Sequence, residues 1–351
     1  MTYAVIGGGN TGQAIASYLS LNNKKVKLYT RDPYKAQRIS QQGLELKGVY
    51  SAYVKLEAHS SLSEVIADSE IIIIATTSSG HKPIIKQIKP FLEDNQTIVF
   101  FPGYWGAVEC HEILDYVIEN KNITIAETSA MPFISRADNK GSVYINRIKN
   151  NVLISTLPTS TNRSISRTFL DTFPQLIPAK NIFETSLNNT NVVVHTPISL
   201  FNASRIDASE EFQFYSTGAS PLAVRYIENL DNERRKIADL FQIKTKDILT
   251  TLNNFYGTNY SNLFDALPSL FPDAAAPTNF DHRYFTEDIP FGLVPISEIG
   301  KKAGVETPYT DSIINTASLF LNKKYREDGV NFDGITFEEL SDLGGLTEMI
   351  N

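Results

Sequence analysis

The sequence predicts an α/β protein, in which a doubly wound parallel sheet is followed by a mainly α-helical domain. Short β-rich segments alternate with amphipathic segments over the first 157 residues, and this alternation is typical of a parallel sheet with helical crossovers. Beyond that point apolar residues recur at helical spacing. Because 351 residues exceed what one hydrophobic core commonly serves, we expect two domains, residues 1–157 and 158–351.

The predicted strands are short runs of β-branched and aliphatic residues. They cover residues 3–6, 26–29, 71–75, 97–101, 123–126, 142–147 and 152–156. A polar segment at residues 159–162 suits a domain boundary or a helix cap. Helices are then expected at residues 182–202, 222–241, 248–255, 296–303 and 312–322. Residues 267–280 contain three prolines and three consecutive alanines, which predicts a long loop.

The composition limits the classes of partner. The net charge of -7 includes no block of like charge, so we expect no nucleic-acid partner. A single cysteine, Cys110, allows neither an internal disulfide nor a thiolate zinc site, which favours a reducing compartment and no structural metal. No signal peptide is evident, and the longest aliphatic run, residues 71–75, is far shorter than the roughly 20 residues of a membrane helix. We expect a cytoplasmic protein that binds small molecules.

A glycine motif lies between the first predicted strand and the helical pattern that follows it. Gly7, Gly9 and Gly12 form G-x-G-x-x-G, in which the glycines permit a tight turn, close approach to a diphosphate and close helix packing. We expect Asn10 or Thr11 to cap the helix, whose N-terminus attracts phosphate. A plain glycine-rich turn is the alternative. In this strand-turn-helix context the motif predicts a Rossmann domain that binds a nicotinamide dinucleotide.

The end of the second strand bears on the choice of cofactor. An acidic residue at this position normally binds the ribose 2′-hydroxyl of NAD. If Thr30 takes that position, Arg31 faces the 2′-phosphate of NADP. If the strand is two residues longer, Asp32 takes the position and the site favours NAD. We favour NADP, since Pro33 ends the turn; a solvated surface charge is the alternative for Arg31.

The third long strand ends in small hydroxylated residues. Residues 71–75 are followed by Thr76 and Thr77, as expected where a loop passes over the cofactor. Residues 100–103 end the next strand in a similar way. Thr76 and Thr77 are therefore candidate cofactor contacts, and plain turns are the alternative.

Of the histidines, one stands in an apolar setting. His59, His81 and His111 lie amid polar sequence and are expected to be exposed. His195 follows three valines, and Asn191 precedes it by one helical turn, so the two share a helix face. A hydrogen-bonded core histidine is the alternative to an acid/base role.

Several further segments combine with the glycine motif in a specific order. They are Glu127-Thr128 with Met131-Pro132; Asn191, His195, Pro197 and Asn202; Pro221 with Asp231, Glu233 and Arg234; Arg283 with Glu287, Asp288 and Pro290; and Val305 with Thr307 and Pro308. Together they resemble the octopine/nopaline (opine) dehydrogenase family over nearly the whole chain.

The resemblance implies a reaction and roles for particular residues. In that family a 2-oxo acid and the amine of an amino acid form an imine, which NAD(P)H reduces. His195 would be the acid/base and Asp288 its partner, while Arg283 would hold the keto-acid carboxylate, and Thr128 and Asn191 are further expected substrate contacts. A loop salt bridge is the alternative for Arg283 and Asp288. Arg31 departs from the familiar NAD-using members.

Two other functions stay open at this point. A ketopantoate reductase-like enzyme shares the two-domain plan, but its catalytic lysine followed by asparagines at four-residue intervals corresponds here to Leu187, Asn191 and His195. A dinucleotide-binding redox sensor would lack a working acid/base pair. The sequence leaves the amino-acid substrate and the oligomeric state undetermined, and a homodimer is compatible with it.

Overall fold

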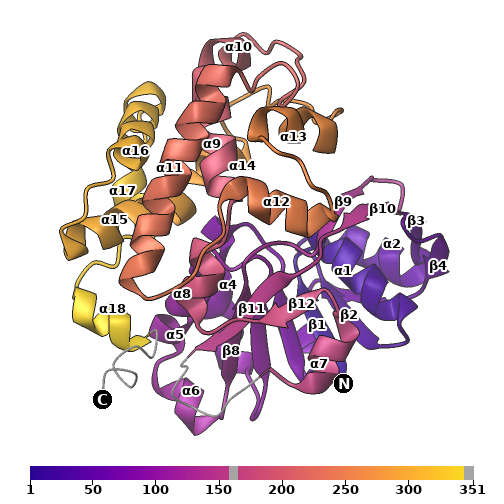
Figure 1. The fold of residues 1–351 in the computed structure, drawn as a ribbon. Coiled ribbons are helices and arrows are strands. Elements are labelled where there is room, and N and C mark those ends of the chain that lie inside the picture. The colour runs from indigo at the N-terminus through magenta and orange to yellow at the C-terminus, as the bar shows by residue number, and fades with distance from the viewer. Residues whose placement is uncertain (158–164, 344–351) are drawn as a thin grey trace. The chain divides into compact units, whose positions relative to one another are not determined.

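The fold is seen in a computed structural model that describes residues 1–157 and 165–343. The chain forms two compact units, Met1–Ser186 and Leu187–Asn351 (Figure 1). The polar segment 159–162, where we expected the domain boundary, lies outside the described residues. The units divide later in the chain, because the strand Leu176–Pro178 pairs with the sheet of the first unit.

The first unit contains an eight-stranded sheet in the order β12-β11-β8-β7-β6-β1-β2-β5. Its strands are β1 (Thr2–Ile6), β2 (Lys25–Tyr29), β5 (Glu57–His59), β6 (Ile71–Ile74), β7 (Thr97–Phe100), β8 (Thr124–Thr128), β11 (Val152–Leu157) and β12 (Leu176–Pro178). The central pairs are parallel, with Ile6 opposite both Tyr29 and Ile74. β11 runs antiparallel to β8, so the sheet is mixed. The predicted doubly wound α/β architecture is confirmed, and β1, β6 and β8 end at the same edge.

A second sheet of four strands has the order β4-β3-β10-β9. Its strands are β3 (Leu44–Gly48), β4 (Ala52–Val54), β9 (Phe133–Ala137) and β10 (Ser142–Ile148). Helix α1 (Asn10–Leu21) packs on β9, where the ring centroids of Tyr18 and Phe133 lie 5.0 Å apart. The sequence did not predict β3, β4, β5, β9 or β12, since these strands are short and several carry charged residues.

Helices accompany the strands of the first unit (Figure 1). They are α1, α2 (Pro33–Gln42), α3 (Leu62–Ile66), α4 (His81–Ile88), α5 (Gly106–Leu114), α6 (Tyr116–Asn120), α7 (Arg167–Thr172) and α8 (Ile182–Leu187), with 3-10 turns η1 (Ser78–Gly80) and η2 (Lys89–Phe91).

The second unit is helical in its described residues. Its helices are α9 (Asn191–Phe201), α10 (Ala203–Asp207), α11 (Pro221–Leu240), α12 (Ile248–Tyr256), α13 (Leu263–Leu270), α14 (Arg283–Thr286), the π-helical turn η3 (Ile289–Leu293), α15 (Val294–Ala303), α16 (Pro308–Leu321), α17 (Tyr325–Asp328) and α18 (Phe337–Leu343). Helix α9 contacts α11, α14, α16 and η3, so it lies at the centre of the unit.

Two predictions about this unit were wrong in detail. The expected helix 182–202 is interrupted between Leu187 and Asn191, giving α8 and α9. The expected loop 267–280 begins inside α13, which tolerates Pro268 and continues to Leu270. None of the helices in the described ranges has the length and apolar character needed to cross a bilayer.

Candidate active site and dinucleotide site

A buried histidine and a buried aspartate meet in the second unit. His195 Nδ1 lies 2.7 Å from Asp288 Oδ2, with side chains 7% and 0% exposed. The two residues are 93 positions apart in the sequence. A carboxylate at this distance fixes the imidazole tautomer and favours the protonated ring.

Close packing of two helical elements allows this contact. Asp288 directly precedes η3, and a Cβ added at Gly292 would lie 2.1 Å from Val192 Cγ1 on α9. Only glycine lets η3 approach α9 this closely, which brings Asp288 within reach of His195. π-helical turns occur often at functional sites.

Two tyrosines complete the surroundings of His195. The Tyr215 hydroxyl lies 3.1 Å from Nε2, the nitrogen that Asp288 does not contact. The Tyr284 ring stacks on the imidazole, with centroids 4.1 Å apart. Sequence reasoning missed Tyr215, which lies in a loop before α11 where no motif marks it, and Tyr284, although it directly follows Arg283.

Arg283 lies on the same turn as Asp288. Its carbonyl accepts a hydrogen bond from the Asp288 backbone N–H, and its side chain is 43% exposed. The guanidinium Nη1 is 3.4 Å from the Glu287 carboxylate. Asn191 is the first residue of α9, one turn before His195. The structure therefore brings Arg283, Asp288 and His195 together in one unit.

The glycine turn has the geometry that a diphosphate requires. A Cβ added at Gly12 would lie 1.7 Å from the Gly7 carbonyl oxygen, whereas one added at Gly9 would meet no atom within 4 Å. Gly9 is the N-cap residue of α1, and no side chain of the described residues caps this helix. The prediction that Asn10 or Thr11 caps it was wrong, because Asn10 Oδ1 instead accepts from the Ala137 N–H. The uncapped N–H groups of α1 suit an anion.

The end of β2 bears on the choice between NAD and NADP. The strand ends at Tyr29, and Thr30 is buried. Asp32 accepts hydrogen bonds from Tyr34 N and Lys35 N as the N-cap of α2, so its carboxylate is engaged. Arg31 is exposed.

The candidate threonines differ in how their hydroxyls are used. Thr76 Oγ1 is buried and has no hydrogen-bond partner among the described residues. The Thr77 hydroxyl lies 3.3 Å from that of Ser79. Thr128 is buried at the end of β8, with the carbonyls of Phe100 and Ala130 within reach of its hydroxyl. The unsatisfied Thr76 hydroxyl, together with the open face at Gly9, fits a bound dinucleotide.

Buried titratable groups lie elsewhere in the first unit. His81 is 1% exposed, so the expectation of an exposed side chain was wrong; its ring packs on Phe100, and burial lowers its pKa to about 3. His59 and His111 are partly exposed. Burial also raises the pKa values of Glu109 and Glu127 to about 7.

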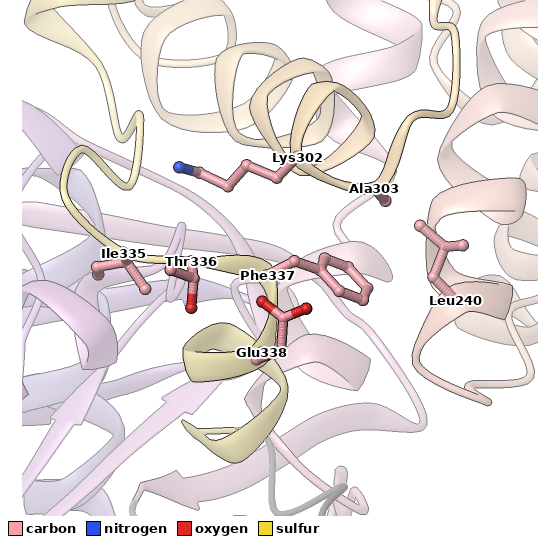
Figure 2. Close-up of a pocket in the computed structure, with 7 residues that line it drawn as sticks. All are labelled: Leu240, Lys302, Ala303, Ile335, Thr336, Phe337 and Glu338. Atoms are coloured by element: carbon pink, nitrogen blue, oxygen red, sulfur yellow. The ribbon is translucent and has the colours of Figure 1, made fainter.

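A separate pocket of about 630 Å³ lies in the second unit (Figure 2). It is lined by Leu240, Lys302, Ala303, Ile335, Thr336, Phe337 and Glu338. The Phe337 ring points toward Leu240 and Ala303. None of the predicted site residues lines this pocket.

Comparison with known proteins identifies the family. Residues 178–321 match the model for the NAD/NADP octopine/nopaline dehydrogenase α-helical domain, and residues 3–107 match ketopantoate reductase PanE/ApbA. An opine dehydrogenase of Arthrobacter sp. (strain 1C) is 31% identical over 99% of this chain and 96% of the relative. The chain belongs to the opine dehydrogenase family.

Further proteins are similar over most of the chain, and the solved structures among them share its fold. A D-nopaline dehydrogenase of Agrobacterium tumefaciens (strain T37) is 23% identical, over 90% of this chain and 84% of the relative. A solved octopine dehydrogenase in complex with NADH and agmatine has a TM-score of 0.80 at 18% identity and covers 98% of both chains. A yersinopine dehydrogenase with bound NADP+ has a TM-score of 0.76 at 13% identity, over 100% of this chain and 99% of that one.

Family membership decides between the functions that the sequence left open. The protein is an NAD(P)-dependent opine dehydrogenase-like oxidoreductase that acts on CH–NH groups by reductive condensation. The ketopantoate reductase match covers only the nucleotide-binding part, and neither that activity nor a redox-sensor role is favoured. The predicted resemblance, fold class and reaction are thus confirmed.

Proposed function

We propose that this enzyme reductively joins a 2-oxo acid such as pyruvate to an amino acid, with His195 and Asp288 as its acid/base pair. The observation that carries the assignment is the 2.7 Å contact between His195 Nδ1 and Asp288 Oδ2 in a buried setting. Condensation of a carbonyl with an amine requires a proton for the departing water. An imidazole that is hydrogen-bonded to a carboxylate can donate that proton and then be reprotonated.

We assign Arg283 to the carboxylate of the 2-oxo acid. Its guanidinium is partly exposed beside the acid/base pair, and a planar fork gives a planar carboxylate one orientation. The 3.4 Å contact with Glu287 holds one end of the group without burying it. Thr128 and Asn191 remain proposed substrate contacts.

Residues of the first unit fit the nicotinamide dinucleotide, which supplies the hydride when bound. Gly7, Gly9 and Gly12 with Asn10 and Thr11 would hold the diphosphate at the N-terminus of α1, and Thr76 and Thr77 would contact the cofactor at the end of β6. We infer a preference for NADP over NAD. The support is the end of β2, where Arg31 is exposed and the Asp32 carboxylate caps α2.

The enzyme is also proposed to work in the cytoplasm. Its single cysteine, Cys110, is buried and unbonded, as expected for a protein kept in a reducing compartment.

A substrate screen tests the proposed reaction. NADPH consumption is followed with pyruvate alone, with pyruvate plus each of a panel of amino acids, and with ketopantoate. We expect oxidation that depends on both the 2-oxo acid and an amino acid, and loss of that activity by a factor of about 10²–10⁴ in His195→Ala. Equal rates with and without the amine, or rapid turnover of ketopantoate, would contradict the proposal.

A further inference from the structure

The imidazole of His195 has hydrogen-bonding groups at both nitrogens. Asp288, which is fully buried, takes Nδ1, and the Tyr215 hydroxyl lies 3.1 Å from Nε2. A tyrosine hydroxyl both donates and accepts, so it can be a partner of the neutral or of the protonated ring. A proton that leaves or reaches His195 at Nε2 therefore meets Tyr215.

Tyr215 is held firmly at this position. Its side chain is 7% exposed and packs on Phe214 and Phe271, with ring centroids 5.0 and 4.9 Å apart. Its loop is fixed by a β-bridge between Gln213 and Ala275. This packing holds the hydroxyl at its position beside Nε2.

Other contacts close two further sides of the imidazole. The Tyr284 ring stacks on one face, with centroids 4.1 Å apart, and Asp288 occupies Nδ1. Burial holds the pKa of Tyr215 well above its usual value, so its hydroxyl stays protonated and can pass a proton only by accepting another at the same time.

Resting on the function proposed above, we propose that Tyr215 is the third member of the proton-transfer chain, and that its hydroxyl relays protons to and from His195 Nε2. The condensation consumes one proton per turnover in addition to the hydride. As the Tyr215 hydroxyl gives its proton to the departing hydroxyl of the condensation intermediate, it accepts the Nε2 proton of His195, and water later returns one proton to His195 along the same path. No tyrosinate forms, and the proton count balances.

The test compares Tyr215→Phe with the unaltered enzyme, measuring kcat, the KM for the 2-oxo acid, NADPH affinity by fluorescence and the solvent isotope effect on kcat. We expect kcat to fall by about 10²-fold with an altered solvent isotope effect, while KM and NADPH affinity change less than about threefold. Besides His195, the charged and titratable groups that face Tyr215 are Tyr284, Tyr256, Arg283 and Asp288. The pH profiles are therefore compared at constant ionic strength.

Tyr226→Phe is the matched control, because it removes a hydroxyl that donates to the Tyr309 carbonyl in the same unit. We expect its kcat and isotope effect to be unchanged. Should Tyr215→Phe lose stability, 3-fluorotyrosine at position 215 keeps the shape and the hydrogen bond but has a more acidic phenol. A relay predicts that kcat and its pH profile change with that acidity, and an unchanged profile overturns the relay.

His195→Ala separates the two proposals. If His195→Ala is inactive but Tyr215→Phe keeps its kcat within about threefold, the substrate displaces Tyr215 and the relay is wrong while the acid/base pair stands. If His195→Ala retains full activity, both proposals fail.

Discussion

Replacing Asp288 with asparagine tests the acid/base pair directly. The carboxylate is fully buried and 2.7 Å from His195 Nδ1, so Asp288→Asn leaves the protonated imidazole without its counter-charge. Breaking a buried pair of this kind costs about 3–5 kcal/mol. At 1.36 kcal/mol per factor of ten, this cost corresponds to a factor of about 10²–10⁴ against the charged imidazole. If protonated His195 is the acid in the condensation, as proposed, activity is lost as pH rises, and this loss should begin at lower pH in the variant.

The assay is kcat against pH for NADPH-dependent condensation. At neutral pH we expect a drop of about 10²–10⁴-fold from the same energies, with NADPH affinity unchanged. Because both replacements disable one proton transfer, Asp288→Asn combined with His195→Ala should be little worse than His195→Ala alone. Asp311→Asn is the matched control, since it removes a carboxylate 2.6 Å from Arg326. An unshifted pH profile in Asp288→Asn would refute the reasoning.

Four further outcomes are expected. Arg31→Ala should raise the KM for NADPH far more than that for NADH. Equal small effects on both KM values would contradict the proposed contact between Arg31 and the 2′-phosphate. Arg283→Lys should weaken keto-acid binding without altering cofactor affinity, because an ammonium cannot reproduce the two-point fork; unchanged keto-acid kinetics would exclude that role. Gly12→Ala places a Cβ 1.7 Å from a carbonyl oxygen, so it should lower both the melting temperature and NADPH binding, and an intact Tm would contradict the observed packing. Burial raises the Glu109 pKa from 4.5 to about 7, so the free energy of unfolding should fall by at most about 3 kcal/mol as pH rises through that window. In denaturant titrations at several pH values, the free energy of unfolding should depend less on pH in Glu109→Gln than in the unaltered enzyme. Equal pH dependence in the two proteins would contradict this role of Glu109.

Local patterns were enough to predict the central elements of the fold. Residues 3–6 and 71–75 are uninterrupted apolar runs, and the strands β1 and β6 formed there because a buried parallel strand requires apolar side chains on both faces. The short strand β5 lies at one edge of the eight-stranded sheet and contains charged and polar residues. Such strands depend on pairing with a neighbour rather than on their own pattern, so no local signal could reveal them.

Other misses have equally local causes. The break between α8 and α9 follows Leu187 in a run of asparagines, whose side chains bond to nearby backbone and favour turns. His81 stands among polar residues but is buried against Phe100, because burial depends on what a distant segment places opposite the side chain. The expected cap at Asn10 or Thr11 is absent for the same reason, since the Ala137 N–H donates to Asn10 Oδ1.

The dinucleotide turn could be predicted from local sequence, since its glycines act within one strand-turn-helix segment, and the family resemblance pointed to His195, Asp288 and Arg283. The contact between His195 and Asp288 is visible in the folded chain alone, because the close approach of Gly292 and Val192 joins segments far apart in the sequence. Tyr215 illustrates the same limit. Its hydroxyl is a candidate for proton transfer because it lies 3.1 Å from His195 Nε2. A contact between a loop and a distant helix leaves no periodicity or spacing in the sequence.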